Sequence, residues 1–332
     1  MANLLLTEKC VRSCPYCFAQ QHMESADNLW MDWEDLIYIA DLHETSGEHA
    51  IALLGGEPTL HPELTEFTLY LVERGFHVNI FTSGIVSDKS FEKMESNLAS
   101  IHPDRISFVC NLNHPDLSTA AEKEKIDRFL NSFGHLTVPG FNVYKLDFDM
   151  DYLIQYVNRF GMRKHIRLGL CHPIVGEKNT YIALDDLKKM AEHLMSYVPV
   201  LEKFRLKLGF DCGMPMCLFS EEQLGILFKL NGGNVIFNCG PALDIGPDMS
   251  VWSCFPLSNY QRKSIYDFDS LNDIRRFYEQ LHHKVRTEAG GIFEECDSCK
   301  YREENLCSGG CLAHLLTRFQ DEPRIRLKEV YP

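Results

Sequence analysis

Three cysteines close to the start of the chain constrain its fold and chemistry more than any other feature. They are Cys10, Cys14 and Cys17, in the segment Cys-Val-Arg-Ser-Cys-Pro-Tyr-Cys, a CxxxCxxC arrangement. Three thiolates at this spacing can hold three irons of a four-iron cluster and leave the fourth iron open to another ligand. A structural zinc site normally has four protein ligands, so the spacing favours a reactive iron–sulfur site.

The composition excludes several classes of protein. The chain has 332 residues, of which 45% are hydrophobic and 13 are cysteine, and its net charge is −14. No apolar run reaches the roughly 20 residues of a membrane helix, and we find no secretory signal. We therefore expect a cytoplasmic protein without membrane contact, whose cysteines are metal ligands or catalytic thiols. The negative charge disfavours a nucleic-acid partner.

Strand-like and helix-like segments alternate over the first 210 residues. The strand-like segments are 4–7, 50–54, 76–81, 105–110, 136–144 and 165–170, and the helix-like segments are 31–44, 62–75, 87–99, 118–133, 151–161 and 184–197. Six strand–helix units in series predict an α/β fold with a parallel sheet and right-handed crossovers. We expect a partial (β/α)6 barrel of the TIM type, with an open doubly wound sheet as the alternative.

The texture of the sequence changes after residue 210. Gly, Pro and Cys become frequent, a hairpin-like segment covers 231–254, a helix is expected over 274–285, and cysteines are dense over 296–311. We interpret residues 1–211 as the barrel and residues 212–332 as a small cysteine-rich α+β domain. Such a domain has too little core of its own and would need metal to hold it together.

A second motif follows the second strand. Residues 53–60 read Leu-Leu-Gly-Gly-Glu-Pro-Thr-Leu, with Gly55, Gly56 and Glu57 at the carboxyl end of the strand. In a parallel barrel the loops after the strands form the active-site face, where the cysteine loop also lies. The glycines allow close approach of the backbone, and a carboxylate suits an ammonium group. Taken alone, the motif could be an ordinary turn into a helix.

Together these motifs resemble the radical SAM superfamily. The resemblance implies a [4Fe-4S] cluster on Cys10, Cys14 and Cys17, whose open iron binds S-adenosylmethionine (SAM). One electron from the cluster then cleaves SAM to methionine and a 5′-deoxyadenosyl radical, which abstracts a hydrogen atom from the substrate. It also implies cofactor contacts for further residues: the methionine amino group meets Gly55, Gly56 and Glu57, and the backbone of Tyr16 contacts adenine.

Two polar residues at later strand ends are weaker candidates for cofactor binding. Ser83 lies in Phe-Thr-Ser-Gly after the third strand, similar to a Thr-Asn-Gly often found there in the family, and Asn111 ends the fourth strand. Ser83 would bind the ribose or methionine part of SAM. Both residues could instead be helix caps or turn formers.

The C-terminal cysteines resemble those of the SPASM domain, an auxiliary iron–sulfur domain of radical SAM peptide maturases. The matching residues are Cys239, Cys254, Cys296, Cys299, Cys307 and Cys311. The chain departs from that pattern, because seven residues separate Cys299 from Cys307, where five are usual, and no cysteine follows Cys311. Cys212 and Cys217 occur earlier instead. These eight cysteines would fill one or two auxiliary [4Fe-4S] clusters, and the sequence does not assign ligands to each.

Cys212 and Cys171 have a competing interpretation. A thiol on the open face of the barrel can donate a hydrogen atom to a substrate radical, as expected of a peptide epimerase. Cys171 ends the sixth strand and is a candidate for this catalytic role, as is Cys212. Cys110 lies within an apolar strand and is interpreted as a core residue.

The resemblance implies an enzyme that modifies a residue of a peptide by hydrogen-atom abstraction. The product could be a crosslink, a thioether, an oxidised residue or an epimer. Its expected partners are a peptide substrate, with a separate leader-recognition protein as one option, and a reductant such as flavodoxin or ferredoxin. The alternatives are a radical SAM dehydrogenase of an aminoglycoside or sugar alcohol, and a non-catalytic iron–sulfur electron carrier or zinc-stapled binding module.

Overall fold

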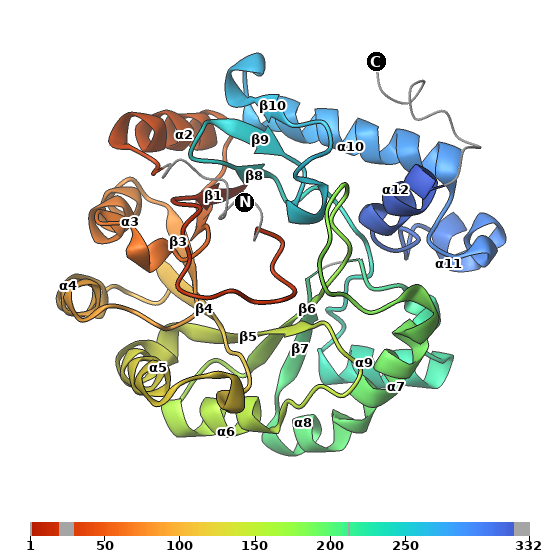
Figure 1. The fold of residues 1–332 in the computed structure, drawn as a ribbon, viewed down its shortest axis with the longest axis horizontal. Helices are drawn as coiled ribbons and strands as arrows, with labels where there is room; N and C mark the ends of the chain where they lie inside the picture. Colours follow the sequence, from red (N-terminus) through yellow and green to blue (C-terminus); the bar gives the residue numbers. More distant parts are fainter. Residues whose placement is uncertain (1, 20–29, 212, 322–332) are drawn as a thin grey trace.

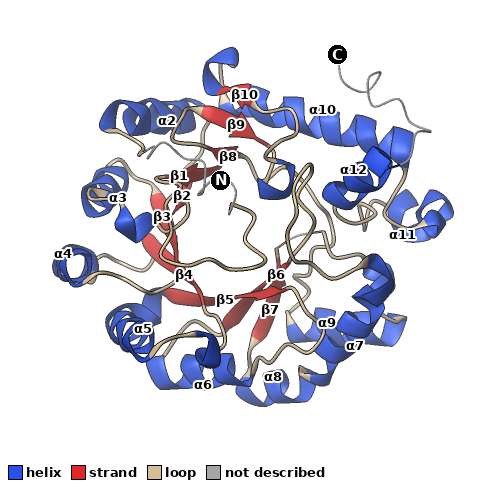
Figure 2. Cartoon of the chain, viewed as in Figure 1, coloured by secondary structure: helices blue, strands red, loops and turns tan. Residues whose placement is uncertain are grey.

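The computed structural model describes residues 2–19, 30–211 and 213–321. Within these residues one ten-stranded sheet runs in the order β10-β9-β8-β1-β2-β3-β4-β5-β6-β7. The strands curve around a common centre, and most helices lie outside them (Figures 1 and 2). The strands are β1 (Ala2–Leu5), β2 (Ala50–Leu54), β3 (His77–Thr82), β4 (Ile106–Asn111), β5 (Thr137–Val143), β6 (His165–Leu170), β7 (Lys207–Phe210), β8 (Asp244–Ile245), β9 (Ser250–Trp252) and β10 (Lys263–Ser264).

The helices of the barrel part follow the strands in regular alternation. They are α2 (Trp33–Thr45), α3 (Leu64–Glu73), α4 (Asp88–Leu98), α5 (Ala120–Phe133), α6 (Asp151–Phe160), α7 (Leu187–Ser196) and α8 (Val198–Phe204). The C-terminal part of the described chain adds α9 (Glu221–Leu230), α10 (Leu271–Ala289), α11 (Lys300–Glu303) and α12 (Leu312–Asp321). The helix starts follow from capping side chains: Asp32 caps α2, and Thr119 with Glu122 forms a capping box on α5.

The predicted α/β class with a parallel sheet is confirmed, with two differences. The first strand covers Ala2–Leu5 rather than 4–7, because the Thr7 carbonyl accepts the N–H of Gly56 in the turn after β2. A seventh parallel strand, β7, extends the sheet past β6. It is only four residues long, which made it hard to separate from the preceding helix by pattern alone.

The C-terminal segment continues the sheet at its other edge. β8 pairs in parallel with β1, in the register Asn3 with Asp244, and β9 and β10 follow as antiparallel strands. Leu243 and Ile245 are fully buried and belong to the same hydrophobic core as the barrel strands. Residues before and after position 212 therefore share one sheet and one core.

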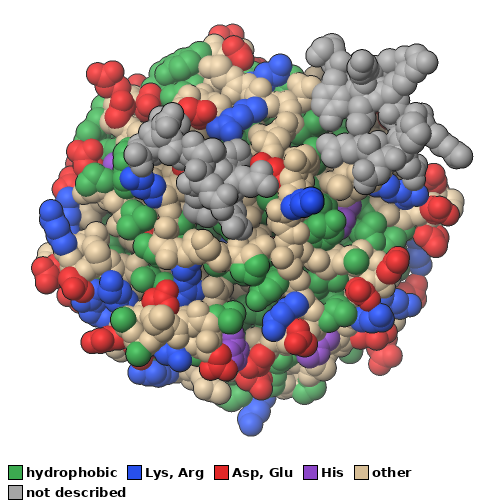
Figure 3. Space-filling view, viewed as in Figure 1, with side chains coloured by type: hydrophobic (Ala, Val, Ile, Leu, Met, Phe, Trp, Pro, Cys, Tyr) green, Lys and Arg blue, Asp and Glu red, His purple; other side chains and the backbone are tan. Residues whose placement is uncertain are grey.

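None of the described helices is long and apolar enough to cross a bilayer. On the face seen in Figure 3, charged side chains lie mostly around the rim, and uncharged and hydrophobic ones occupy most of the visible centre. The loop that follows β1, red in Figure 1, lies inside the ring of strands.

Candidate active site

The loop that carries the three N-terminal cysteines is anchored on the turn after β2. The N–H of Gly56 donates to the Thr7 carbonyl at 2.9 Å, and the N–H of Glu57 donates to the Lys9 carbonyl at 2.7 Å. A Cβ on Gly55 would lie 2.2 Å from the Thr7 oxygen, and one on Gly56 would lie 2.2 Å from the Lys9 oxygen. The glycines are therefore required by the approach of the cysteine loop itself.

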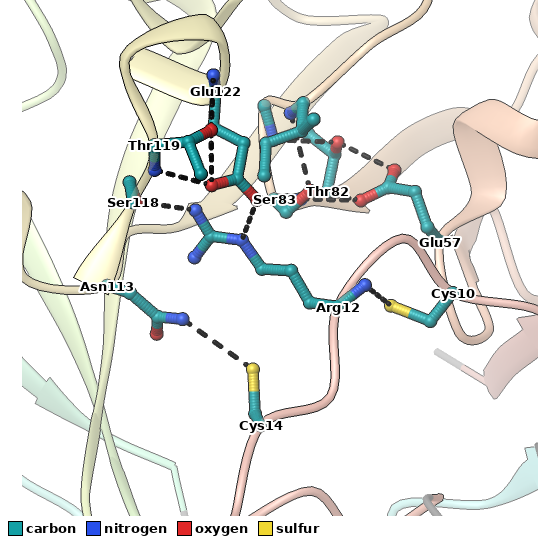
Figure 4. A network of polar contacts seen from close by, with 12 residues as sticks. Cys10, Arg12, Cys14, Glu57, Thr82, Ser83, Asn113, Ser118, Thr119 and Glu122 are labelled. Atoms are coloured by element: carbon teal, nitrogen blue, oxygen red, sulfur yellow. Dashed lines mark hydrogen bonds and ion pairs between the residues drawn. The ribbon is translucent and has the colours of Figure 1, made fainter.

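The three thiols of this loop lie in an environment suited to an iron–sulfur cluster. Cys10 accepts a hydrogen bond from the Arg12 N–H at 3.4 Å, and Cys14 accepts one from Asn113 Nδ2 at 3.6 Å (Figure 4). The Cys17 sulfur accepts one from the Ala19 N–H at 3.4 Å. Such donors stabilise cluster sulfurs and tune the cluster. Burial raises the pKa of Cys10 to about 11, so this thiol needs a bound cation to remain a thiolate.

Arg12 ties the cysteine loop to the start of α5. Its Nη2 donates to Ser118 Oγ at 2.8 Å, and its Nε lies 4.0 Å from a carboxylate oxygen of Glu122, the residue that also completes the capping box with Thr119 (Figure 4). The loop is thus held from two sides, by the turn after β2 and by the N-terminus of α5.

Glu57 is buried and its carboxylate is already hydrogen-bonded. One oxygen accepts bonds from the hydroxyls of Thr59 and Thr82, each at 2.8 Å, and the other accepts from the Ser83 amide at 2.8 Å and the Ser83 hydroxyl at 2.6 Å. Only 1% of Glu57 is exposed. The structure therefore gives this side chain the role of fixing the end of β3, and its predicted contact with an ammonium group stays a prediction.

A cavity of about 320 Å³ opens beside the cysteine loop. The cysteine loop, the strand ends and the C-terminal segment all contribute to its wall. The predicted residues in this wall are Cys10, Cys14, Tyr16, Cys17, Gly55, Gly56, Glu57, Ser83, Asn111 and Cys254. The structure thus gathers the predicted cofactor residues around one space, together with one cysteine of the C-terminal set.

Tyr16 is held in the wall by two contacts. Its hydroxyl donates to Asn113 Oδ1 at 2.6 Å, and its ring lies 4.7 Å from that of Tyr144, measured between centroids. Burial, with the nearby Cys14 thiol, raises the pKa of Tyr16 well above its ordinary value, so the phenol stays protonated. Since Asn113 also donates to Cys14, it joins the tyrosine to the cysteine loop.

Sequence reasoning missed an ion pair in the same cavity. Arg167 on β6 contacts Asp211, directly after β7, at 2.5 Å, and its guanidinium lies 4.6 Å from the centre of the Phe81 ring. Burial raises the pKa of Asp211 to about 6, although Arg167 opposes the shift. Arg167 lies within β6 and Asp211 directly follows the adjacent parallel strand β7, a signal that could have found the pair had β7 been recognised.

Asp244 was also missed, and it is as deeply buried in the cavity wall as Glu57. Its exposure is 1%, its Oδ1 accepts from Asn3 Nδ2 at 2.7 Å, and the Trp252 side chain and the Phe255 backbone also lie beside the carboxylate. Burial raises the pKa of Asp244 to about 7, although hydrogen bonds from Asn3, Trp252 and the Phe255 backbone oppose the shift. Pattern alone did not reveal this residue, because it faces the cavity only once β8 pairs with β1.

The other described cysteines of the C-terminal set form two groups. Cys239 and Cys254 lie close enough to Cys311 to raise the pKa of its thiol. We call these three cysteines the proximal group, because Cys254 lines the cavity. The distal group contains the four thiols of Cys217, Cys296, Cys299 and Cys307. Burial raises the pKa of Cys217, and the nearby thiols of the other three raise it further. Each group unites residues that are far apart in the sequence.

The structure describes only one of the two cysteines that we considered as hydrogen-atom donors. Cys171 is buried directly after β6, its N–H donates to the Val143 carbonyl at 2.9 Å, and it does not belong to the cavity wall. Cys212 lies outside the described residues. Its neighbour Gly213 packs against Cys239 and Cys311 of the proximal group. The role of each thiol stays a prediction. Cys110 is buried in β4, as expected of a core residue.

The family of the N-terminal segment follows from comparison with known proteins. Residues 4–109 match the family described as the radical SAM superfamily, and this range contains both anchored motifs and Ser83. Residues 4–109 form a radical SAM domain. The cofactors of this domain are SAM and the [4Fe-4S] cluster that binds it, and the three hydrogen-bonded thiols described above fit that cluster.

Two curated radical SAM relatives differ in how much of this chain they cover. PqqA peptide cyclase of Bradyrhizobium diazoefficiens is 24% identical over 95% of this chain and 82% of its own length. The S-adenosylmethionine-dependent nucleotide dehydratase of Selenomonas ruminantium is 38% identical, but over only 25% of this chain and 29% of its own length. The first similarity therefore includes the C-terminal segment, whereas the second is confined to a short stretch.

Two solved structures share the fold over nearly the whole chain. Streptococcus suis SuiB bound to its precursor peptide SuiA superposes with a TM-score of 0.66 at 14% identity, and covers 97% of this chain and 73% of SuiB. Native anSMEcpe with bound AdoMet gives a TM-score of 0.64 at 17% identity, and covers 94% of this chain and 90% of that protein. The radical SAM barrel and the C-terminal segment thus occur together in known folds.

The close approach at Gly56 yields a test of the anchor. We expect Gly56→Ala to destabilise the protein by ~1–3 kcal/mol or more, because the new Cβ overlaps the backbone of Lys9, and to reduce iron bound by the radical SAM domain. Gly225→Ala is the matched control, since Gly225 is exposed in α9 with open space around it, and should stabilise by ~0.5–1 kcal/mol. Equal iron content and stability for both variants would contradict the anchoring role.

The raised pKa of Asp244 yields a test in pH. Its folded pKa of about 7 exceeds the unfolded value of 3.8, so ionisation costs stability as pH rises between these values. The free energy of unfolding of Asp244→Asn, relative to that of the native protein, should therefore increase through this pH window by at most ~4 kcal/mol. Above pH 7 this difference should stay constant. Denaturant unfolding measured from pH 4 to 8 checks this.

Asp248, on the same hairpin, provides the control for this test. Although burial opposes the shift, hydrogen bonds from Ser250 and the charge of Arg262 lower the pKa of Asp248. Asp248→Asn should therefore lose stability above about pH 4, the opposite sign. A pH-independent difference between native protein and Asp244→Asn would contradict the assignment of a strongly perturbed carboxyl.

Proposed function

We propose that this radical SAM enzyme modifies a residue of a peptide substrate by hydrogen-atom abstraction. The observation that carries the proposal is the composition of the cavity wall. The cysteine loop and the Gly-Gly-Glu-Pro turn, where SAM would bind, line this cavity together with Asp244, Cys254 and Phe255 of the C-terminal segment. A radical formed at the cysteine loop would meet its substrate in the same cavity.

The comparisons support a peptide as the substrate. PqqA peptide cyclase matches this chain over most of both lengths, including the C-terminal segment that completes the cavity. SuiB, which shares the fold, has been solved with a precursor peptide bound. The sequence also allows a dehydrogenase that acts on a small molecule, and the experiments below distinguish this function from peptide modification.

The residues of the site have defined tasks in this proposal. Bound at Cys10, Cys14 and Cys17, the cluster with SAM supplies the 5′-deoxyadenosyl radical. Glu57 holds the turn after β3, so that Ser83 faces the cofactor space in a fixed position. Asn111 offers a side-chain oxygen that is buried and has no hydrogen-bond partner among the described residues, which suits a donor on SAM.

Other residues of the cavity wall would position the substrate. Asp244 presents a buried carboxyl at the cavity, which suits an N–H or O–H donor of a peptide residue. The Arg167–Asp211 pair offers both a cation and a carboxylate at the cavity. A reductant such as flavodoxin or ferredoxin would supply the electron that starts each turnover.

We further propose that the two cysteine groups hold two auxiliary [4Fe-4S] clusters, as in a SPASM domain. The distal group has four thiols, the number that closes such a cluster. Cys217 would provide the ligand that the family pattern takes from a cysteine after Cys311. The proximal group has three described thiols, and Cys212, next to Gly213, would be the fourth ligand.

Cleavage of SAM tests the enzymatic proposal. Reconstituted anaerobically and given SAM with dithionite, the protein should form 5′-deoxyadenosine, measured by chromatography with mass detection. The Cys14→Ala variant should lose this activity at least a hundredfold, because the cluster loses one of its three ligands. An intact cluster without any 5′-deoxyadenosine would reject the enzyme and favour an electron carrier.

The peptide substrate is tested separately. Short peptides encoded beside the gene for this chain are incubated with the active enzyme and examined by mass spectrometry. A loss of two mass units per modification, with 5′-deoxyadenosine formed in proportion, is expected for a crosslink or an oxidation, and no mass change with solvent deuterium uptake for an epimer. Stimulation only by an aminoglycoside or sugar alcohol would favour the small-molecule dehydrogenase.

Iron content tests the auxiliary clusters. Three [4Fe-4S] clusters correspond to about 12 irons per chain, and Cys217→Ala should reduce this number toward eight. Cys110→Ala, in the core of β4, should leave the iron content unchanged. A native content near four would reject both auxiliary clusters, and one near eight would leave a single auxiliary cluster.

A further inference from the structure

Arg286 on α10 holds the loop that connects the two cysteine groups. Its Nη1 donates to the carbonyl of Ser308, and its Nη2 donates to the carbonyl of Gly310 at 3.0 Å. These carbonyls lie between Cys307 of the distal group and Cys311 of the proximal group. A guanidinium presents its N–H groups in a rigid planar fork, so two adjacent carbonyls are bound together in one geometry.

The loop is shaped to present its carbonyls to Arg286. Gly309 and Gly310 both have positive φ, at 78° and 84°, which side chains other than glycine rarely adopt. The hydroxyl of Ser308 accepts the N–H of Cys239 at 2.8 Å, and the Gly309 carbonyl accepts the N–H of Ile292 at 3.0 Å. The loop therefore holds Cys239 of the proximal group through a backbone hydrogen bond.

Among the described residues, no carboxylate forms an ion pair with Arg286, whereas the neighbouring Arg302 lies 3.6 Å from Asp297. The Arg286 guanidinium instead lies against the thiol of Cys239. An iron–sulfur cluster with four thiolate ligands carries a net negative charge, and a partly buried, unpaired cation beside one of its ligands compensates that charge.

A second arginine extends this arrangement. Arg302 Nη2 donates to the Arg286 carbonyl at 2.7 Å, and its Nη1 donates to the Cys296 carbonyl at 3.3 Å. Arg302 therefore braces the end of α10 against the distal group. Because its charge is shared with Asp297, it compensates the adjacent thiols less than Arg286 does.

We propose that Arg286 is a positioning residue that raises the reduction potential of the cluster held by the proximal group. The inference rests on the auxiliary clusters of the proposed function. A positive charge near a cluster favours its reduced, more negative form, and hydrogen bonds from the same residue hold the ligand loop. The proximal cluster, next to the cavity, then accepts electrons more readily than it would without this arginine.

The potential can be measured directly on the holoenzyme. In redox titrations followed by electron paramagnetic resonance, Arg286→Gln should decrease the ratio of reduced to oxidised proximal cluster at a fixed potential about tenfold, which equals ~59 mV for a one-electron couple. Arg286→Lys keeps the charge but loses the fork, and should give a smaller decrease and a lower melting temperature. Lys284→Gln removes an exposed charge from the same helix and should change neither.

The outcomes separate this inference from the function on which it rests. Native protein with about four irons per chain would reject the auxiliary clusters, and the role of Arg286 with them. A full iron content in Arg286→Gln with an unchanged potential would overturn the role of Arg286 alone. If Arg286→Gln loses iron, Arg286→Met, which also removes the charge but keeps a long side chain, is measured in its place: a decreased potential supports the proposal and an unchanged one overturns it.

Discussion

Two backbone hydrogen bonds between the cysteine loop and the turn after β2 hold the site together. They join Gly56 to Thr7 and Glu57 to Lys9, and they form only because glycines at 55 and 56 admit the loop carbonyls. The Glu57 side chain also connects this turn to the end of β3, because its carboxylate accepts hydrogen bonds from Thr82 and Ser83. The loop between β1 and α2 is thereby fixed against two neighbouring strand ends.

The second constraint is the pairing of β8 with β1. This pairing brings a segment from more than 200 residues away to the first edge of the barrel, where Asn3 binds Asp244. It places Asp244 and Cys254 in the wall of the cavity that the cysteine loop also lines. A buried carboxyl whose pKa is raised by burial is costly to ionise, and a site that binds a donor group gives a reason for the cost.

The regular part of the fold was readable in the sequence because each element is long enough to show its period. The helix predicted over 118–133 is α5 (Ala120–Phe133), and the strand predicted over 165–170 is β6. β7 has four residues and β8 has two, so neither shows a period. The missed site residues Asp211 and Asp244 belong to these short strands, because their positions depend on pairing partners rather than on local pattern.

Motif and composition determined that the N-terminal cysteines meet the Gly-Gly-Glu-Pro turn, because parallel strands bring their carboxyl ends to one edge. They also indicated that the later cysteines bind metal. Only the tertiary structure decided that the glycines serve the cysteine loop and that Glu57 is already hydrogen-bonded. It alone divided the C-terminal cysteines into two groups with Arg286 between them. Spacing records distance along the chain, whereas ligand sets and charge compensation depend on distance through space.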